Sequence, residues 1–166
     1  MMFIGIDISK LSFDVAILLD DGKYVHKKFD NNLSGFKSLF KWQKGFGQAA
    51  VFCLEATGIY GLALAKFIYR QAQKVVVVNP IKTHAFVKME MSRTKTDKAD
   101  AMSIARYCKH LNDNNKLEES LFVPKSLSYE RLQNLITRLE QLTKLKGQES
   151  NRLSVSLDKD ASTSVK

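Results

Sequence analysis

The alternation of apolar and polar positions predicts three short strands at the beginning of the chain. Apolar, β-branched-rich runs over 3–8 and 12–19 are typical of buried strands, and a third strand is predicted over 24–29. Between the second and third strands, residues 20–23 read Asp-Asp-Gly-Lys. This sequence predicts a hairpin turn, because Asp-Gly tolerates the positive φ angles that such turns need. We therefore expect an antiparallel meander of three strands.

Helices and strands alternate after this meander. Apolar positions at helical spacing cover 33–45 and 60–71, and continuous apolar runs typical of central strands cover 49–54 and 74–79. Pro80 ends the second of these strands and opens a helical turn. Strands joined through helices run parallel with right-handed crossovers. The pattern predicts an α/β fold: a five-stranded mixed sheet, with three antiparallel strands and then parallel strands, flanked by helices.

The last part of the chain has a different pattern, which predicts a heptad-type helix over 125–150 after a domain over 1–124. Its apolar positions recur in steps of three and four, at Leu132, Leu135, Leu139 and Leu142. This helix either packs on its own domain or pairs two copies of the chain through residues 127–146. Residues 151–166 contain few bulky apolar side chains, and we expect them to form a flexible tail.

The charge balance narrows the choice of partners. The chain has 26 Lys and Arg residues against 17 Asp and Glu residues, a net charge of +9. Such an excess favours nucleic acid, although a basic protein without that partner is the alternative. No apolar run approaches the roughly 20 residues of a membrane span, and the N-terminus lacks a signal-peptide pattern, so we expect a cytoplasmic protein. Cys53 and Cys108 have no zinc-like spacing and are predicted to be reduced and buried.

Two aspartates, Asp97 and Asp100, lie three positions apart in a segment that otherwise predicts a helix. At this spacing they share one helix face, with Cβ atoms about 5–6 Å apart, and their charges repel. Neighbouring lysines or a divalent metal should therefore lie between them. Asp7 and Glu55, each near the end of a predicted strand, are the carboxylates that could meet the same metal. The alternative is a solvated helix face on which both aspartates pair with adjacent lysines.

Basic residues near these acids are candidates for contacts with nucleic-acid phosphates. They either bind phosphate or neutralise the acids in the absence of metal, and they are Lys10, Arg93, Lys95 and Lys98. Thr57 and Gly58 follow Glu55 directly. They either let the backbone approach Glu55 closely or, in the case of Gly58, simply start the next helix.

Four local motifs occur in order along the chain: Gly-Ile-Asp-Ile-Ser-Lys at 5–10, Glu-Ala-Thr-Gly-Ile-Tyr at 55–60, Asn-Pro at 79–80, and Lys-Thr-Asp-Lys-Ala-Asp-Ala at 95–101. Together with the order of elements, they resemble the DEDD transposases of bacterial insertion sequences. That family includes the Piv DNA invertase, and its N-terminal domain is similar to the RuvC junction resolvase, with a ribonuclease H-like fold. The resemblance covers about residues 2 to 150. It implies a catalytic, metal-binding tetrad of Asp7, Glu55, Asp97 and Asp100.

The resemblance also implies a function. The chain would be the N-terminal domain of a transposase that binds DNA and cleaves and joins its strands, with insertion-sequence ends and target DNA as partners. A structured guide RNA is implied in some members. The expected cofactor is Mg²⁺ or Mn²⁺, because carboxylates suit hard cations and four of them could hold two ions about 3.5–4 Å apart. We expect a homo-oligomer, and a further domain carrying a nucleophilic serine, without which this fragment would be inactive.

Three alternatives to a transposase domain remain at this stage. The first is a stand-alone RuvC-like junction nuclease. The second is a module that binds nucleic acid and dimerises without cutting. The third is a sugar kinase of the actin-like fold, whose opening strand and Asp-Asp-Gly hairpin are similar. Such kinases need glycine-rich phosphate loops, and only scattered glycines follow here.

Overall fold

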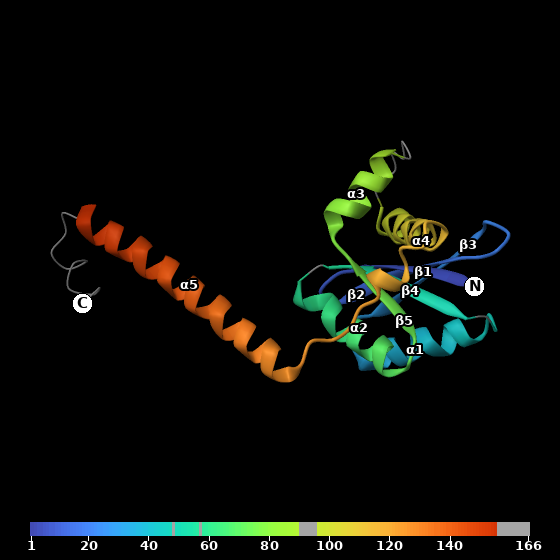
Figure 1. Cartoon of the computed structure of the whole chain (residues 1–166), viewed down its shortest axis with the longest axis horizontal. Coiled ribbons are helices and arrows are strands. Elements are labelled where there is room, and N and C mark those ends of the chain that lie inside the picture. The colour runs from blue at the N-terminus through green and yellow to red at the C-terminus, as the bar shows by residue number, and fades with distance from the viewer. Residues whose placement is uncertain (48, 57, 90–95, 156–166) are drawn as a thin grey trace. The chain divides into compact units, whose positions relative to one another are not determined.

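The computed structural model describes residues 1–47, 49–56, 58–89 and 96–155. The chain divides into two compact units, Met1–Pro124 and Lys125–Lys166. The first unit is a sheet with helices on both faces, and the second contains one long helix (Figure 1). None of the helices in the described ranges has the length and apolarity of a membrane span.

The sheet has five strands in the order β3-β2-β1-β4-β5 (Figure 1). The three antiparallel strands and the two parallel ones confirm the predicted mixed sheet. Their bounds are β1 Met2–Ile8, β2 Ser12–Leu18, β3 Tyr24–Asp30, β4 Ala50–Glu55 and β5 Lys74–Val78. Strand β1 lies at the centre, antiparallel to β2 and parallel to β4, and nearly all of its side chains are buried.

Helices cover the two faces of the sheet unequally. Helices α1 (Leu33–Lys44) and α2 (Ile59–Arg70) cover one face, where their apolar side chains share a core with alternate residues of the strands. Helix α4 (Asp97–Asp113) covers the other face (Figure 1). Helix α3 (Pro80–Met89) leads away from β5, and a short 3-10 turn (Glu118–Ser120) follows α4. We call these faces the α1/α2 face and the α4 face.

The close approach of α4 to the sheet depends on Gly5 in the middle of β1. A Cβ atom at this position would lie 2.0 Å from the carbonyl oxygen of Ala101 and 2.3 Å from the backbone nitrogen of Ala105. Glycine in the strand and alanines in the helix therefore allow the two backbones to touch. On the same face, the free cysteines Cys53 and Cys108 are buried where β4 meets α4, as predicted. The tight contact fixes where the first turn of α4 lies over the sheet.

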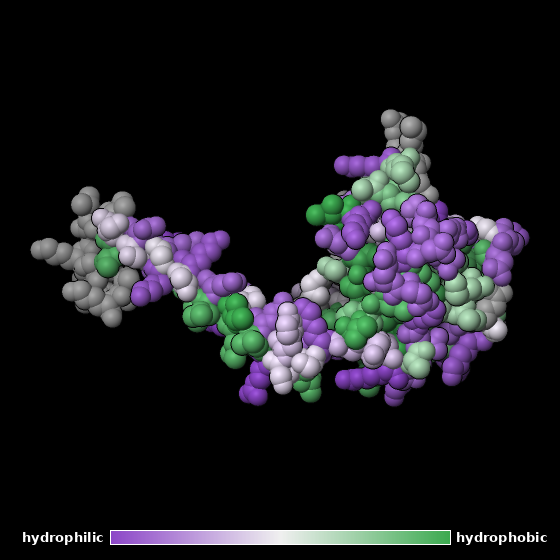
Figure 2. Space-filling view, in the orientation of Figure 1, coloured by the Kyte–Doolittle hydropathy of each residue, from purple (hydrophilic) through white to green (hydrophobic). Residues whose placement is uncertain are grey.

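The second unit contains α5 (Leu127–Val155), which begins within the predicted heptad segment and continues five residues beyond its expected end at 150. An ion pair 2.5 Å long joins Glu149, near the end of the predicted segment, to Arg152 in the added turn. This pair, at the i and i+3 positions of a helix, stabilises the helical conformation in the first residues of the segment that was predicted to be a tail. Residues 156–166 lie outside the described residues. The helix exposes large apolar side chains, including Leu135 and Leu139, which are 63% and 65% exposed (Figure 2).

Candidate active site

A row of charged side chains crosses four adjacent strands on the α4 face of the sheet. Asp7 of β1 is paired with Asp14 of β2, and Asp14 is paired in turn with Lys28 of β3. On the other side of β1, Ile6 is paired with Leu54, so Glu55 follows Leu54 just as Asp7 follows Ile6. Glu55 is the last residue of β4. Strand pairing alone therefore brings Lys28, Asp14, Asp7 and Glu55 to one end of the sheet.

The first turn of α4 supplies two further carboxylates. The side chain of Thr96 caps the helix by accepting a hydrogen bond from the backbone nitrogen of Ala99, at 3.1 Å. Asp97 and Asp100 lie in the turn that follows. Negative charge is stabilised there by the helix dipole, and a threonine cap satisfies one free N–H group. The sequence Thr-Asp-Lys-Ala-Asp is thus a good helix start that also concentrates carboxylates.

The electrostatics of Asp7 show that the acids meet in space. Burial, and then the negative charges of Asp100, Glu55, Asp97 and Asp14 in that order, together raise the pKa of the Asp7 carboxyl from 3.8 to about 6. Like charges and partial burial both disfavour the ionised form. The charges of the other three acids of the predicted tetrad therefore act on Asp7, and Asp14 adds a further carboxylate that does the same.

Two acids of the tetrad have partners within the protein. The buried hydroxyl of Thr83, in α3, donates a hydrogen bond to the Glu55 carboxylate. The ammonium of Lys28 lies 3.8 Å from the carboxylate of Asp97, whose side chain is 72% exposed. A positive partner of Asp97 thus comes from a strand that is distant in sequence.

The donor set fits a hard divalent cation by its chemistry, since carboxylate oxygens are the preferred ligands of Mg²⁺ and Mn²⁺. Among the side chains that the structure describes, however, no three of the His, Cys, Asp or Glu residues form a group ready to hold a metal ion. The contacts of Thr83 with Glu55 and of Lys28 with Asp97 offer a physical reason. Coordination by the whole tetrad would require these two carboxylates to turn toward Asp7.

Comparison with known proteins decides the family. The model of the IS110-type DEDD transposases, described as "Transposase", matches residues 4–159, almost the whole chain. The chain belongs to this family. Its relatives include the "Pilin gene-inverting protein" of Moraxella bovis and that of Moraxella lacunata, each 39% identical over 108 residues. Each match covers 63% of the chain and 33% of the relative, so the matched part spans about a third of these longer proteins.

Solved structures confirm the expected fold of this transposase-family domain. The RuvC structure of Thermus thermophilus aligns with a TM-score of 0.56 at 11% identity, covering 74% of the chain and 100% of RuvC. The same RuvC in complex with a Holliday junction substrate gives a TM-score of 0.54, also at 11% identity, with 74% and 99% covered. The ribonuclease H-like, RuvC-like fold is therefore shared, although little sequence is.

Sequence reasoning on this family member missed three residues of the site: Asp14, Lys28 and Thr83. Asp14 could have been found, because a carboxylate inside an apolar strand needs a partner and the hairpin places it opposite Asp7. Thr83 is in the first turn of the helix that follows Asn79-Pro80, next to the end of β4. Lys28 gave no signal, since an exposed lysine on an edge strand is ordinary.

The predicted phosphate contacts and loop residues have mixed outcomes. Lys10 and Lys98 are exposed, one after β1 and the other in the first turn of α4, and phosphate binding by them stays a prediction. Arg93 and Lys95 lie outside the described residues, as does Thr57. Gly58 caps α2 with φ +64° and has open space around a Cβ position. Backbone conformation, and not a close approach to Glu55, is therefore what favours glycine there.

Proposed function

We propose that this chain supplies the carboxylates for metal-dependent DNA strand cleavage and joining during transposition. The observation that carries the proposal is the approach of the other three acids of the tetrad to Asp7, whose pKa is raised to about 6 first by burial and then by the neighbouring negative charges. A stable domain gains nothing from gathering carboxylates at the end of its central strand unless they bind something positive. Membership of a transposase family makes the phosphodiester backbone of DNA the substrate that fits.

Each element of the domain has a part in the proposed chemistry. Strands β1 and β4 present Asp7 and Glu55, and the first turn of α4 presents Asp97 and Asp100 from above the sheet. When bound, Mg²⁺ or Mn²⁺ would supply Lewis acidity for attack on phosphate and for departure of the leaving oxygen. The carboxylates hold such ions, and nearby cations of the chain contact the DNA backbone. We assign that second task to Lys10, Arg93, Lys95 and Lys98.

The partners follow from the family and its relatives. The relatives are named for inverting a pilin gene, which is an action on DNA. The structurally similar RuvC was solved in complex with a Holliday junction substrate. For this chain we infer binding to insertion-sequence ends and target DNA, with a structured guide RNA as a further partner. The relatives are about three times longer than the matched stretch, so the complete reaction would need a second domain with its serine. Pairing of copies through residues 127–146 would place two such domains together.

A second function is favoured by one observation. Because the described carboxylates form no ready three-ligand group, the chain by itself would serve as a nucleic-acid-binding and dimerisation module. In that case cutting would begin only when DNA and the remaining domain complete the site. A stand-alone junction nuclease has no separate support, since the likeness to RuvC is one of fold.

Transposition by the full-length protein tests the proposal. We expect Asp7→Asn and Asp97→Asn to abolish transposition while each domain stays folded, because each removes a charge from the metal-binding group. Asp113→Asn is the matched control: it removes an acid from the other end of α4, where Asp113 pairs with Lys109. Normal transposition by either tetrad variant would contradict the proposal, as would an equal loss in the control.

A further inference from the structure

A buried carboxylate outside the tetrad holds two basic side chains beside the site. Asp14 is 6% exposed and lies directly across the strand pair from Asp7. One of its oxygens is 2.8 Å from Nε2 of His26 and the other is 3.0 Å from Nζ of Lys28. A carboxylate so deeply buried is costly unless it is paired and hydrogen-bonded. Asp14 therefore anchors Lys28 to a fixed place on the sheet.

Lys28 links the sheet to the first turn of α4. Its ammonium lies 3.0 Å from Asp14 on β2 and 3.8 Å from Asp97 on α4. The hydrogen bond to Asp14, the charge of Asp14, and then the charges of Asp97 and Asp7 raise the pKa of the Lys28 ammonium above its usual value. Lys28 thus stays positively charged and faces the same acids that a divalent ion would need.

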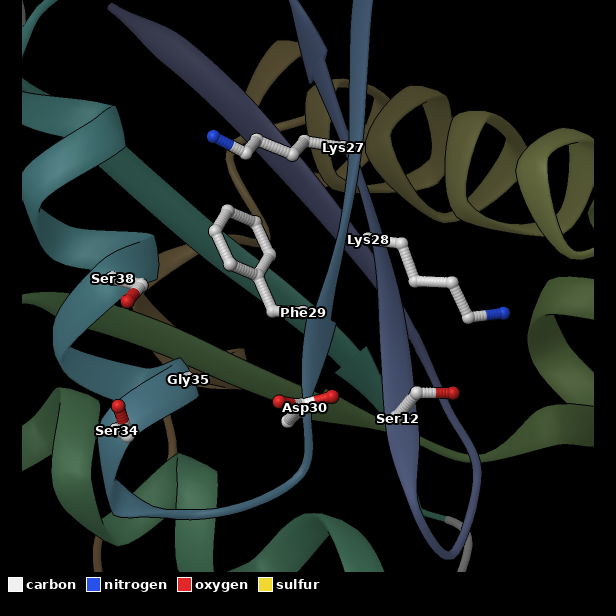
Figure 3. Close-up of a pocket in the computed structure, with 8 residues that line it drawn as sticks. All are labelled: Ser12, Lys27, Lys28, Phe29, Asp30, Ser34, Gly35 and Ser38. Carbon is white, nitrogen blue, oxygen red and sulfur yellow. The ribbon is translucent and has the colours of Figure 1, made fainter.

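The neighbouring lysine on the same strand faces away from the acids. Lys27 and Lys28 leave β3 on opposite sides, with Lys27 and Phe29 on the side of α1 (Figure 3). There the Lys27 ammonium lies 5.5 Å from the centre of the Phe29 ring, beside a hollow of about 380 Å³ that the start of α1 also lines. Both lysines are exposed and carry the same charge, but their side chains leave β3 toward opposite faces of the sheet.

We propose that Lys28, anchored by Asp14, is a positioning residue of the acidic site, a built-in cation that holds Asp97 and competes with a divalent ion for it. This inference rests on the proposed function, because it assumes that the tetrad binds metal. While Lys28 holds Asp97, the repulsion among the acids is reduced and α4 can lie close to the sheet. Metal binding must then separate Asp97 from Lys28, while Asp14 keeps the ammonium at the edge of the site.

The competition has a measurable size. A positive charge a few ångströms from a divalent ion weakens its binding through direct repulsion and by occupying one of its ligands. Near a solvated surface, removing that charge should tighten metal binding roughly three- to tenfold, and the gain should shrink as salt is added. A cation on the opposite face of the sheet is screened from the ion and should have far less effect.

The experiment is calorimetric titration of the chain with MnCl₂, at low and at high salt. We expect Lys28→Gln to bind Mn²⁺ roughly three- to tenfold more tightly than the wild type, and Lys28→Arg to keep wild-type affinity. Lys27→Gln is the matched control, since it removes the same charge from the next residue, and its affinity should stay within about twofold of wild type. If Lys28→Gln does not fold, Lys28→Met replaces it, because its aliphatic stem preserves the packing.

The outcomes separate the inference from the proposed function. Binding that needs Asp7 but is unchanged in Lys28→Gln would overturn the inference and leave the metal site standing. An equal gain in Lys27→Gln would also overturn it, because overall charge would then be the cause. Binding by Lys28→Gln where the wild type binds nothing would support the competition most strongly. If neither binds Mn²⁺, the metal site fails, and the inference fails with it.

Discussion

The two faces of one sheet have been put to different uses. The α1/α2 face is closed by large apolar side chains, among them Phe13, Phe36 and Phe52, whose rings pack against neighbouring rings. The α4 face has fewer large residues, a bare glycine under the helix, and a row of charged groups where β1 and β4 end. Because strand side chains alternate, the same strands supply both. One face holds the fold together, and the other holds a site that costs stability.

The largest effect should come from breaking the apolar face. Phe52 is fully buried and stacks on Phe40 with ring centres 5.5 Å apart. Phe52→Ala would remove this packing and leave a cavity, lowering the free energy of unfolding by about 3–5 kcal/mol. Urea denaturation measures the change. A loss below about 1 kcal/mol would mean that this face is not the main source of stability.

A smaller but more specific loss is expected when the close contact on the α4 face is disturbed. In Gly5→Ala, the new methyl group would collide with the backbone of Ala101 and Ala105 and push α4 away from β1. Overpacking of this kind costs about 1–3 kcal/mol, and here it also moves Asp97 and Asp100 away from Asp7. We expect lower stability in urea together with weaker Mn²⁺ binding. Weaker stability with unchanged Mn²⁺ binding would separate the packing from the site.

Removing a charge from the site should have the opposite sign. Since the folded-state pKa of Asp7 is raised to about 6, folding favours its protonated form, and its ionisation destabilises the fold as pH rises from about 4 through 6. Asp7→Asn should therefore stabilise the metal-free chain at pH 7 by about 1–2 kcal/mol after allowance for solvent screening. The gain should disappear below pH 4. Thermal melts at pH 4, 5, 6 and 7 measure it, and a destabilised variant at pH 7 would mark Asp7 as structural.

The order of elements could be predicted because each strand and helix carries its own periodicity. Runs such as Val75–Val78, and the Asn79-Pro80 pair that follows β5, can be recognised without tertiary information. The tetrad is predicted from local motifs through the family resemblance, and Thr96 and Asp97 form a helix start that the sequence alone indicates. These features are encoded within a few residues of one another.

The rest of the site depends on contacts between distant segments. Lys28 reaches Asp97 across 69 positions of sequence, because β3 lies two strands from β1 and α4 crosses above them. Thr83 meets Glu55 only after β4 and β5 have paired. No sequence pattern within a single strand or helix indicates contacts of this kind between distant segments. The extension of α5 to Val155 was missed because low apolar content was taken to mean a tail, although an isolated helix needs only local support.

The central claim is that the acids of the α4 face bind a divalent ion, and thermal melting in increasing Mn²⁺ tests it most directly. An ion that binds only the folded chain must raise its melting temperature by mass action. At an ion concentration of 100 Kd, the free energy of unfolding rises by about 2.7 kcal/mol. The wild type should show a rise that grows with the logarithm of the Mn²⁺ concentration above Kd, that Asp7→Asn loses and that Lys27→Gln keeps. A wild type that melts at the same temperature with and without Mn²⁺ would contradict the account.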